Sequence, residues 1–328
     1  MLAPVSIAGV AKCVPERIVT NFDLESLVET SDEWIAKRTG IRTRRVVAEE
    51  TGVGMACRAA REALEMSGTA AKDVGIVVAC TITGEDLTPS MASSIQKTLG
   101  IPACAALDVS AGCTGFIYAL VTAASLMDTL QMDVALVVAS EVMTKYLDWS
   151  DRSTCVLFGD GAGALVLRRS ETAHVSFPIL SATADVDEVI TLKKEARSTP
   201  FTGPVEAVSS IIKMKGADVF TYAVGVLERT LLQLSEACTD RPYTKIVPHQ
   251  ANEKIIDFVA RSMGISREQF FVDISNYANT SSASIPIALC DAWESGWLNA
   301  GDRVALVGFG SGLTSGGAVI DWTIPNEV

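Results

Sequence analysis

The chain has 328 residues, of which 48% are hydrophobic and only 6% aromatic, and its formal net charge is −12. This length suits one large globular unit or two tightly joined halves. Because aromatic residues are few, the core must be mainly aliphatic, as in buried sheets covered by helices. The negative charge argues against nonspecific nucleic-acid binding, because contacts to phosphates need a positive field. No run of about 18 apolar residues is present, so we expect no membrane span.

The cysteines and the N-terminus indicate the compartment. The first residues lack a basic region followed by an apolar stretch, so we predict no secretory signal. None of the eight cysteines forms a C-x-x-C pair, which argues against a zinc or redox motif. In a long chain without a signal we expect these thiols to be reduced and the protein to be cytoplasmic, with no metal and no bound redox cofactor.

The first half of the chain alternates short apolar strands with helix-like segments. Residues 76–80 predict a buried strand, and residues 90–99 predict a helix that ends at Gly100. Residues 116–127 are apolar nearly all round, which is typical of a helix buried between sheets. Residues 134–140 predict a further buried strand.

The second half repeats this order about 170 residues later. Residues 245–250 predict a strand, residues 253–263 a helix, residues 279–284 a turn and residues 304–310 a strand. Matched elements at a near-constant offset indicate a duplicated α/β unit with mostly parallel sheets. We therefore expect two halves, and their boundaries are 1–170 and 171–328. Residues 171–215 are expected to form a linker and surface elaboration.

Cys113 lies in the segment Asp108-Val-Ser-Ala-Gly-Cys113-Thr-Gly-Phe, between a predicted strand and the apolar helix. At a helix N-terminus, unpaired backbone N–H groups and the positive end of the dipole favour a thiolate. This position predicts a nucleophile. The alternative is a packing cysteine, because free cysteine is among the most buried residue types.

A glycine-rich segment, Gly159-Asp-Gly-Ala-Gly-Ala, precedes a predicted strand. A dinucleotide site or a P-loop needs the opposite order, with the glycines after a strand and before a helix. We therefore interpret it as a tight turn with a close approach of backbones and not as a phosphate site.

Two polar residues of the second half are expected to meet Cys113. His249 follows a buried strand, and Asn279 begins the turn that corresponds to the cysteine turn. Sites in open parallel sheets lie beyond the carboxyl ends of the strands, so the two halves should bring these residues together. His174 lies in the polar segment and is interpreted as a surface residue.

A Cys, His and Asn set predicts acyl transfer, in which the sulfur takes an acyl group and N–H donors hold the oxyanion. Papain-like proteases carry the same residues in the same order. However, their Cys-Gly-Ser-Cys-Trp signature is absent, and a duplicated unit does not suit them.

The chain resembles β-ketoacyl-acyl-carrier-protein synthase III, a type III member of the thiolase-like superfamily, over nearly its whole length. The resemblance implies a five-layer α-β-α-β-α fold built from the duplicated α/β unit. The segments that carry it are the Cys113 segment, Val247-Pro-His249-Gln-Ala-Asn252, Asn279-Thr-Ser-Ser-Ala-Ser-Ile-Pro, Thr30-Ser-Asp-Glu-Trp34-Ile-Ala-Lys-Arg38, Asp151-Arg152, Phe158-Gly-Asp-Gly-Ala-Gly-Ala and Gly308-Phe-Gly-Ser-Gly-Leu-Thr.

The activity implied by the resemblance is a decarboxylative Claisen condensation that initiates type II fatty acid synthesis. An acyl-CoA would prime Cys113, and malonyl carried on acyl carrier protein would then enter. His249 and Asn279 resemble the family pair that stabilises the enolate, and the backbone N–H groups of Cys113 and Ser311 match the oxyanion hole. Acyl-CoA is a substrate in this scheme, and no cofactor is implied.

The resemblance also assigns residues to binding. Trp34, Arg38 and Arg152 match contacts to CoA, in which an aromatic ring stacks on adenine and arginines face phosphate. Lys254 matches a basic position that faces the acidic carrier protein. Thr88 matches a position that shapes the acyl pocket of the partner subunit, since the family is expected to form a homodimer.

Several positions depart from the family pattern and leave the acyl donor and the acceptor open. They are Ala217, Thr221, Ala278, Ser311 and Ser315. One alternative is therefore a condensing enzyme or acyltransferase of specialised metabolism, of the polyketide or quinolone type. Another is a catalytically idle binding subunit with the thiolase fold.

Overall fold

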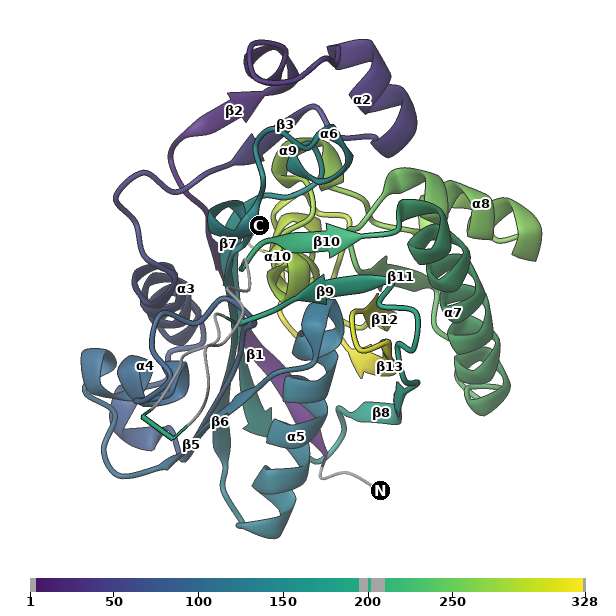
Figure 1. Cartoon of the computed structure of the whole chain (residues 1–328). Helices are drawn as coiled ribbons and strands as arrows, with labels where there is room; N and C mark the ends of the chain where they lie inside the picture. Colours follow the sequence, from purple (N-terminus) through teal and green to yellow (C-terminus); the bar gives the residue numbers. More distant parts are fainter. Residues whose placement is uncertain (1–3, 195–199, 202–209, 327–328) are drawn as a thin grey trace.

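The computed structural model describes residues 4–194, 200–201 and 210–326. Two β-sheets lie face to face, with helices between them and on both outer sides (Figure 1). This arrangement is the predicted five-layer order of helix, sheet, helix, sheet and helix. Small helices and a two-stranded ribbon lie above one end of the layers (Figure 1).

The first sheet has five strands. β4 is parallel to both of its neighbours, whereas β7 is antiparallel to both of its own. In order across the sheet the strands are β1 (Val5–Cys13), β7 (Asp160–Arg169), β6 (Val134–Val142), β4 (Ile76–Cys80) and β5 (Ala105–Val109).

The second sheet has four strands in an equivalent order. They are β11 (Lys245–Pro248), β12 (Arg303–Gly310), β13 (Thr314–Asp321) and β8 (Val175–Ala182). Only β11 and β12 are parallel. Where the first sheet has β5 as its edge strand, the second sheet has a single parallel bridge between Ile246 and Phe270. The repeated strand order is what the duplicated sequence pattern predicts.

Two expectations about this part of the fold were wrong. The sheets are mixed and not mostly parallel, because β12 and β13 are joined by a short turn that permits only an antiparallel pair. The segment 171–215 is not only a linker. It supplies β8, the edge strand of the second sheet, and the ribbon of β9 (Ile190–Leu192) with β10 (Ile212–Met214). Residues 195–199 and 202–209 of this segment lie outside the described residues.

Two helices fill the space between the sheets. They are α5 (Gly115–Thr129) and α10 (Ser284–Glu294), and both contribute fully buried side chains such as Phe116 and Ile285. One hydrophobic core joins these helices to the inner faces of both sheets. The apolar circumference of α5 is therefore explained by burial on every side. Because the halves share this core, their division into two domains stays a prediction.

The outer layers are amphipathic helices whose ends the sequence fixes. Ser90 and Asn252 accept hydrogen bonds from the first turns of α4 (Met91–Leu99) and α8 (Glu253–Met263). Both helices end at a glycine with φ of 67°, a left-handed conformation that glycine adopts without strain. The other outer helices are α3 (Gly52–Met66) and α7 (Gly216–Ala237).

The small elements form a cap held by a buried arginine. The guanidinium of Arg44 donates to Asn21 Oδ1 at 2.9 Å and to the carbonyl oxygen of Val156 at 3.0 Å. The helices of this cap are α1 (Asn21–Leu24), α2 (Asp32–Thr39), α6 (Arg152–Cys155) and α9 (Ile274–Tyr277), and its strands are β2 (Ile18–Thr20) and β3 (Thr43–Arg45). Short 3₁₀ turns are η1 (Ala71–Asp73), η2 (Gly112–Thr114), η3 (Met143–Tyr146), η4 (Arg267–Gln269) and η5 (Ser281–Ala283).

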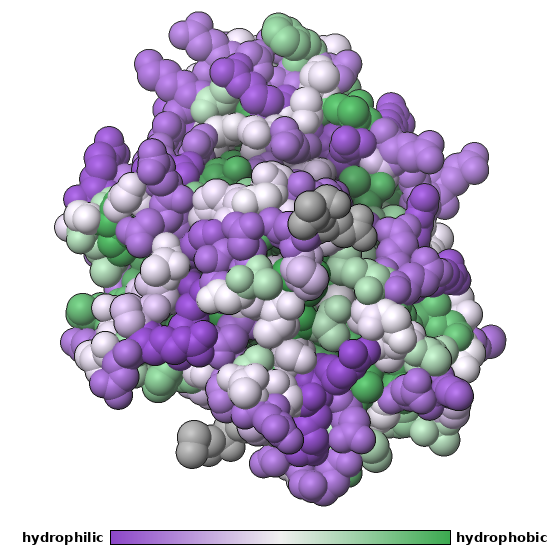
Figure 2. Space-filling model, turned by 180° about the vertical axis from the view of Figure 1, so that it is seen from behind, coloured by the Kyte–Doolittle hydropathy of each residue, from purple (hydrophilic) through white to green (hydrophobic). Residues whose placement is uncertain are grey.

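On the face opposite that of Figure 1, hydrophilic residues are spread widely and apolar residues occur in small groups (Figure 2). Among the described residues, no helix combines the length and the hydropathy needed to cross a membrane.

From Asp160 on, the glycine-rich segment is the first part of β7 and not a turn, which corrects that part of the prediction. The close approach of backbones is confirmed. A Cβ added at Gly163 would lie 2.8 Å from Cβ of Pro286 on α10, which is closer than two carbon atoms can pack. Glycine is therefore required for the central helix to contact the first sheet.

We expect Gly163→Ala to lower the free energy of unfolding by about 1–3 kcal/mol, because the added methyl group overpacks the contact with α10. The matched control is Gly225→Ala in α7, where no atom lies within 4 Å of the added carbon. That change should stabilise by about 0.5–1 kcal/mol. Urea unfolding of both variants checks the prediction, and equal effects would contradict it.

Candidate active site

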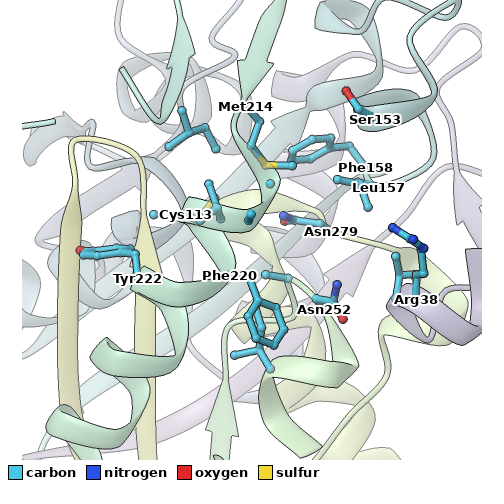
Figure 3. Close-up of a pocket in the computed structure, with 18 of the residues that line it drawn as sticks. Arg38, Cys113, Ser153, Leu157, Phe158, Met214, Phe220, Tyr222, Asn252 and Asn279 are labelled. Carbon is cyan, nitrogen blue, oxygen red and sulfur yellow. The ribbon is translucent and has the colours of Figure 1, made fainter. Parts of the chain in front are cut away.

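A cavity of about 580 Å³ lies where the cap meets the ends of both sheets. Six of the residues predicted from the sequence line it, and they come from both halves of the chain. They are Trp34, Arg38, Cys113, Arg152, His249 and Asn279. Figure 3 shows Cys113 and Asn279 facing the same space, with Arg38 toward one end of it.

Cys113 lies in η2, directly before α5 and almost fully buried. Its backbone is pressed against the end of β12, since a Cβ at Gly310 would lie 2.7 Å from the Cys113 nitrogen. Gly112 has φ of 56°, and a side chain there would meet Ser311. The two glycines thus allow the cysteine turn of one half to touch the β12–β13 turn of the other.

Threonine side chains hold this contact in place. The Thr114 and Thr314 hydroxyls are 3.0 Å apart, and Thr314 Oγ1 lies 2.9 Å from the carbonyl oxygen of Ala111. The backbone N–H of Ser311 has no hydrogen-bond partner within the described ranges. Ser311 therefore has an unpaired donor close to the backbone of Cys113, although Ser311 is not among the residues that line the cavity. Its predicted place in an oxyanion hole stays a prediction.

Burial controls the charge of Cys113. It raises the pKa of the thiol to about 11, and a hydrogen bond with the Ser281 side chain offsets only part of that rise. The thiol is therefore protonated at neutral pH in the free chain. The thiolate expected from the helix N-terminus is not the resting state, because loss of solvation outweighs the local donors.

The ring of His249 is held as a neutral donor. It is buried, and this lowers its pKa to about 3. Nδ1 lies 2.7 Å from the hydroxyl oxygen of Ser284, which also accepts a hydrogen bond from the backbone N–H of Gln250. No other acceptor for the Ser284 hydroxyl occurs in the part of the chain that the structure describes, so this hydroxyl donates to Nδ1. The proton of the neutral ring then lies on Nε2.

The amide of Asn279 is oriented in a similar way. Its Oδ1 accepts the backbone N–H of Ser281 at 2.8 Å, and a backbone N–H can only donate. The side-chain NH₂ group is therefore the end left for the cavity. Backbone hydrogen bonds to Leu157 and Gly159 fix the segment against the other half. Together, His249 and Asn279 offer two neutral N–H donors beside a sulfur nucleophile.

At the other end of the cavity, Trp34 lies close to two arginines. The guanidinium carbons of Arg38 and Arg152 are each 4.8 Å from its ring centroid. Arg152 also donates to the carbonyl oxygen of Glu29 at 2.7 Å. An aromatic surface with two cations suits a flat ring attached to phosphate groups.

Two predicted binding residues lie outside the cavity lining. Lys254 lies in the first turn of α8, next to the lining residues Asn252 and Ile255, and contacts Asp257 at 3.3 Å. Thr88 is exposed on the loop before α4. Its predicted contact is with a second subunit, so its role stays a prediction.

The positions that depart from the family pattern lie around the same cavity. Ala217 lines it, and Thr221 bonds back to the Ala217 carbonyl oxygen at 3.0 Å without entering it. Ser315 is buried in β13. Ala278 has φ of 59°, a conformation that glycine adopts more easily. This strain explains why glycine is usual immediately before Asn279.

Sequence reasoning missed three polar residues that surround the site. Ser284 hydrogen-bonds His249, Ser281 lowers the pKa of Cys113, and the fully buried Glu141 accepts a hydrogen bond from Ser281. A glutamate at the end of an otherwise apolar strand was the available signal for Glu141. The apolar lining was also missed, because its members are scattered along the chain. They include Ile190, Met214, Phe220, Tyr222, Phe309 and Leu313.

His174, interpreted as a surface residue, is half-buried and lies outside this cavity. No group of three or more His, Cys, Asp or Glu side chains suited to a metal ion occurs within residues 4–194, 200–201 and 210–326.

The fold and the cavity define a thiolase-like protein with a cysteine at the head of its central helix. Family models described as 3-oxoacyl-[acyl-carrier-protein] synthase III and as its C-terminal part match residues 107–187 and 237–322. Beta-ketoacyl-[acyl-carrier-protein] synthase III of Clostridium acetobutylicum is 39% identical, over 97% of this chain and 99% of the relative. The chain belongs to the 3-oxoacyl-[acyl-carrier-protein] synthase III family.

Solved structures agree with this assignment. The 3-oxoacyl-[acyl-carrier-protein] synthase III of Aquifex aeolicus VF5 superposes with a TM-score of 0.90 at 37% identity, covering 97% of this chain and all of that one. The priming β-ketosynthase of the R1128 polyketide pathway superposes with a TM-score of 0.87 at 31% identity, covering 99% of this chain and 98% of that one. The predicted family and fold class are therefore confirmed.

We expect the ring of His249 to stay neutral between about pH 5 and pH 8, because burial holds its pKa far below the ordinary value. ¹⁵N-histidine NMR of a His174→Gln variant, which leaves a single imidazole, checks this. The shifts should indicate a protonated Nε2 and should not change across that range. A titration midpoint within the range would contradict the assignment.

Proposed function

We propose that the chain catalyses the acyl-CoA-primed decarboxylative Claisen condensation with malonyl-acyl carrier protein that initiates type II fatty acid synthesis. The observation that supports this most directly is one cavity that holds a cysteine, two neutral N–H donors and an arginine-flanked tryptophan. The names of the relatives agree with it. The enzyme is accordingly an acyltransferase of the condensing type.

In the first step, Cys113 attacks the thioester carbonyl of the acyl-CoA. The carbonyl oxygen gains negative charge, and we assign the backbone N–H groups of Cys113 and Ser311 to bind it. The carbon–sulfur bond to CoA then breaks, and the acyl group stays on Cys113. Trp34, Arg38 and Arg152 hold the nucleotide end of CoA at the opposite end of the cavity.

In the second step, the malonyl thioester loses carbon dioxide. The electron pair of the broken carbon–carbon bond becomes an enolate, whose charge lies on the thioester oxygen. His249 Nε2–H and the Asn279 amide donate to that oxygen, and both donors are neutral. The enolate carbon then attacks the acyl group on Cys113, and the sulfur leaves as the carbon–carbon bond forms.

The apolar lining supports this chemistry. Phe220, Phe309 and Leu313 line the cavity together with Cys113. In a cavity with few polar walls, water is scarce, so hydrolysis of the acyl-cysteine is slowed and donors act in a low dielectric. An acyl chain of apolar character fits the same walls.

The remaining partners follow from the same proposal. Lys254, beside the cavity mouth, contacts the acidic carrier protein, although its charge is shared with Asp257. Two copies of the chain form a homodimer, in which Thr88 of one copy borders the acyl pocket of the other. The enzyme acts in the cytoplasm on acyl-CoA and malonyl-acyl carrier protein, and needs no cofactor.

A role in specialised metabolism is not favoured. The similarity to the polyketide priming enzyme is lower, at 31% identity, than the 39% shared with the clostridial synthase III. An idle binding subunit is also disfavoured, because all three reactive positions are filled.

We expect incubation with a labelled short-chain acyl-CoA to give one acyl adduct per chain, because Cys113 is the nucleophile. Intact-protein mass spectrometry should show it in the native protein and in Cys104→Ala, which removes a half-exposed thiol outside the cavity. Cys113→Ala should abolish it. The absence of any adduct from a panel of short and medium acyl-CoAs would overturn the proposal.

We expect His249→Ala and Asn279→Ala to slow carbon dioxide release from malonyl-acyl carrier protein by about 10²–10³-fold, since each removes one donor to the enolate oxygen. Formation of the acyl adduct should persist in both, because neither donor serves that step. His174→Ala is the control. Unchanged carbon dioxide release in both active-site variants would show that the donors have no such role.

A further inference from the structure

The proposed acylation requires the Cys113 thiol to lose a proton inside a buried cavity. His249 is badly placed to accept it, because the neutral ring carries its proton on Nε2 and its Nδ1 accepts from Ser284. Burial also opposes a charged imidazole. The proton acceptor is therefore another group near the sulfur.

Glu141 is the buried acid connected to this sulfur. It lies at the end of β6 with no exposed surface. Its Oε2 accepts the backbone N–H of Ile82 at 3.1 Å and the hydroxyls of Thr83 at 2.7 Å and Thr81 at 3.2 Å. Each hydroxyl also accepts a backbone N–H, from Thr83 or from Val142, and has its own proton to give to Glu141. Burial raises the pKa of the Glu141 carboxyl above its ordinary value, and these hydrogen bonds oppose that rise. Three donors on Oε2 favour the ionised form and leave no place for a proton on that oxygen.

The other oxygen of Glu141 faces the second half of the chain. Oε1 accepts the Ser282 hydroxyl at 2.6 Å and the Ser281 hydroxyl at 3.3 Å. Ser281 is fully buried, and its side chain is close enough to the Cys113 sulfur to lower the pKa of the thiol. The Ser281 hydroxyl thus lies between the thiol and Oε1, the carboxylate oxygen that has fewer donors.

We propose that Ser281 relays the thiol proton of Cys113 to Oε1 of Glu141 when the sulfur is acylated. This inference rests on the proposed function for its substrate, but the relay itself requires only the three side chains. Ser281 is the catalytic residue that touches the reacting sulfur, and Glu141 is the proton acceptor behind it.

The protons and electrons balance without another reagent. As the sulfur attacks the thioester carbon, the S–H proton passes to Ser281 Oγ while the Ser281 proton passes to Glu141 Oε1. When the bond to CoA breaks, its electron pair stays on the CoA sulfur. The proton then returns from Glu141 through Ser281 to that sulfur, so that CoA leaves as a thiol and the carboxylate is ionised again.

Other titratable groups near the relay stay neutral at working pH. Cys80 on β4 and Tyr146 on η3 both face Glu141, and burial raises the pKa of each. His249 is neutral for the reason given above. Between about pH 6 and pH 9 none of the three changes charge, so a pH dependence in this range reports on Cys113 and Glu141.

The test measures alkylation of Cys113 by iodoacetamide from pH 6 to pH 9, with peptide mapping to isolate this thiol. A general base keeps the rate constant with pH once the base is ionised. The native profile should therefore level off near neutrality. In Ser281→Ala and in Glu141→Gln it should instead rise about tenfold per pH unit, and at pH 7 the rate should fall by about 10²-fold.

The control is Ser140→Ala, which removes an equally buried hydroxyl from β6, one residue before Glu141. Among the described residues, this hydroxyl bonds only to the Gly52 carbonyl oxygen. Its profile should level off like that of the native protein. A profile that levels off in either relay variant, or a native profile that does not, would overturn the relay. Since no acyl-CoA is used, this result is independent of the adduct assay that tests the proposed function.

Discussion

The contact between the cysteine turn and the β12–β13 turn is the constraint on which the site depends. It favours glycine at positions 112 and 310, since a side chain at 112 would meet Ser311 and one at 310 would collide with the backbone of Cys113. The Thr114–Thr314 hydrogen bond then fixes the two turns relative to each other. The contact is possible only because α5 and α10 share one core between the sheets, so that the strand ends of both halves open toward the same cavity.

Burial gives the site its chemical character. It raises the pKa of Cys113 and lowers that of His249, so both are neutral in the free chain. Neutral donors suit the stabilisation of an enolate, but a neutral thiol must lose its proton during the reaction. Glu141 is an acid inside the same interior. Burial raises its pKa, and donors from both halves offset part of that rise. The same carboxylate therefore joins the halves and faces the sulfur.

The fold was largely predictable because duplication leaves a repeated pattern. The helices predicted at 90–99 and 253–263 are confirmed, because the N-caps and the glycines that end them act locally. The antiparallel pairs were not predictable from alternation of strands and helices, because strand direction depends on how the chain returns to the sheet. The edge strand β8 was missed because five of its eight residues are exposed and its sequence lacks a buried pattern.

By itself the sequence determined the duplicated α/β architecture, the family, and the side chains of Cys113, His249 and Asn279 at strand and helix ends. These are properties of local pattern and of motif. The tertiary structure alone decided which groups are charged and which atoms donate, because solvation and hydrogen-bond partners come from residues far apart in the chain. Ser284 fixes the tautomer of His249, and Glu141 reaches Ser281 across 140 positions. No sequence spacing specifies such a contact until the two halves pack together.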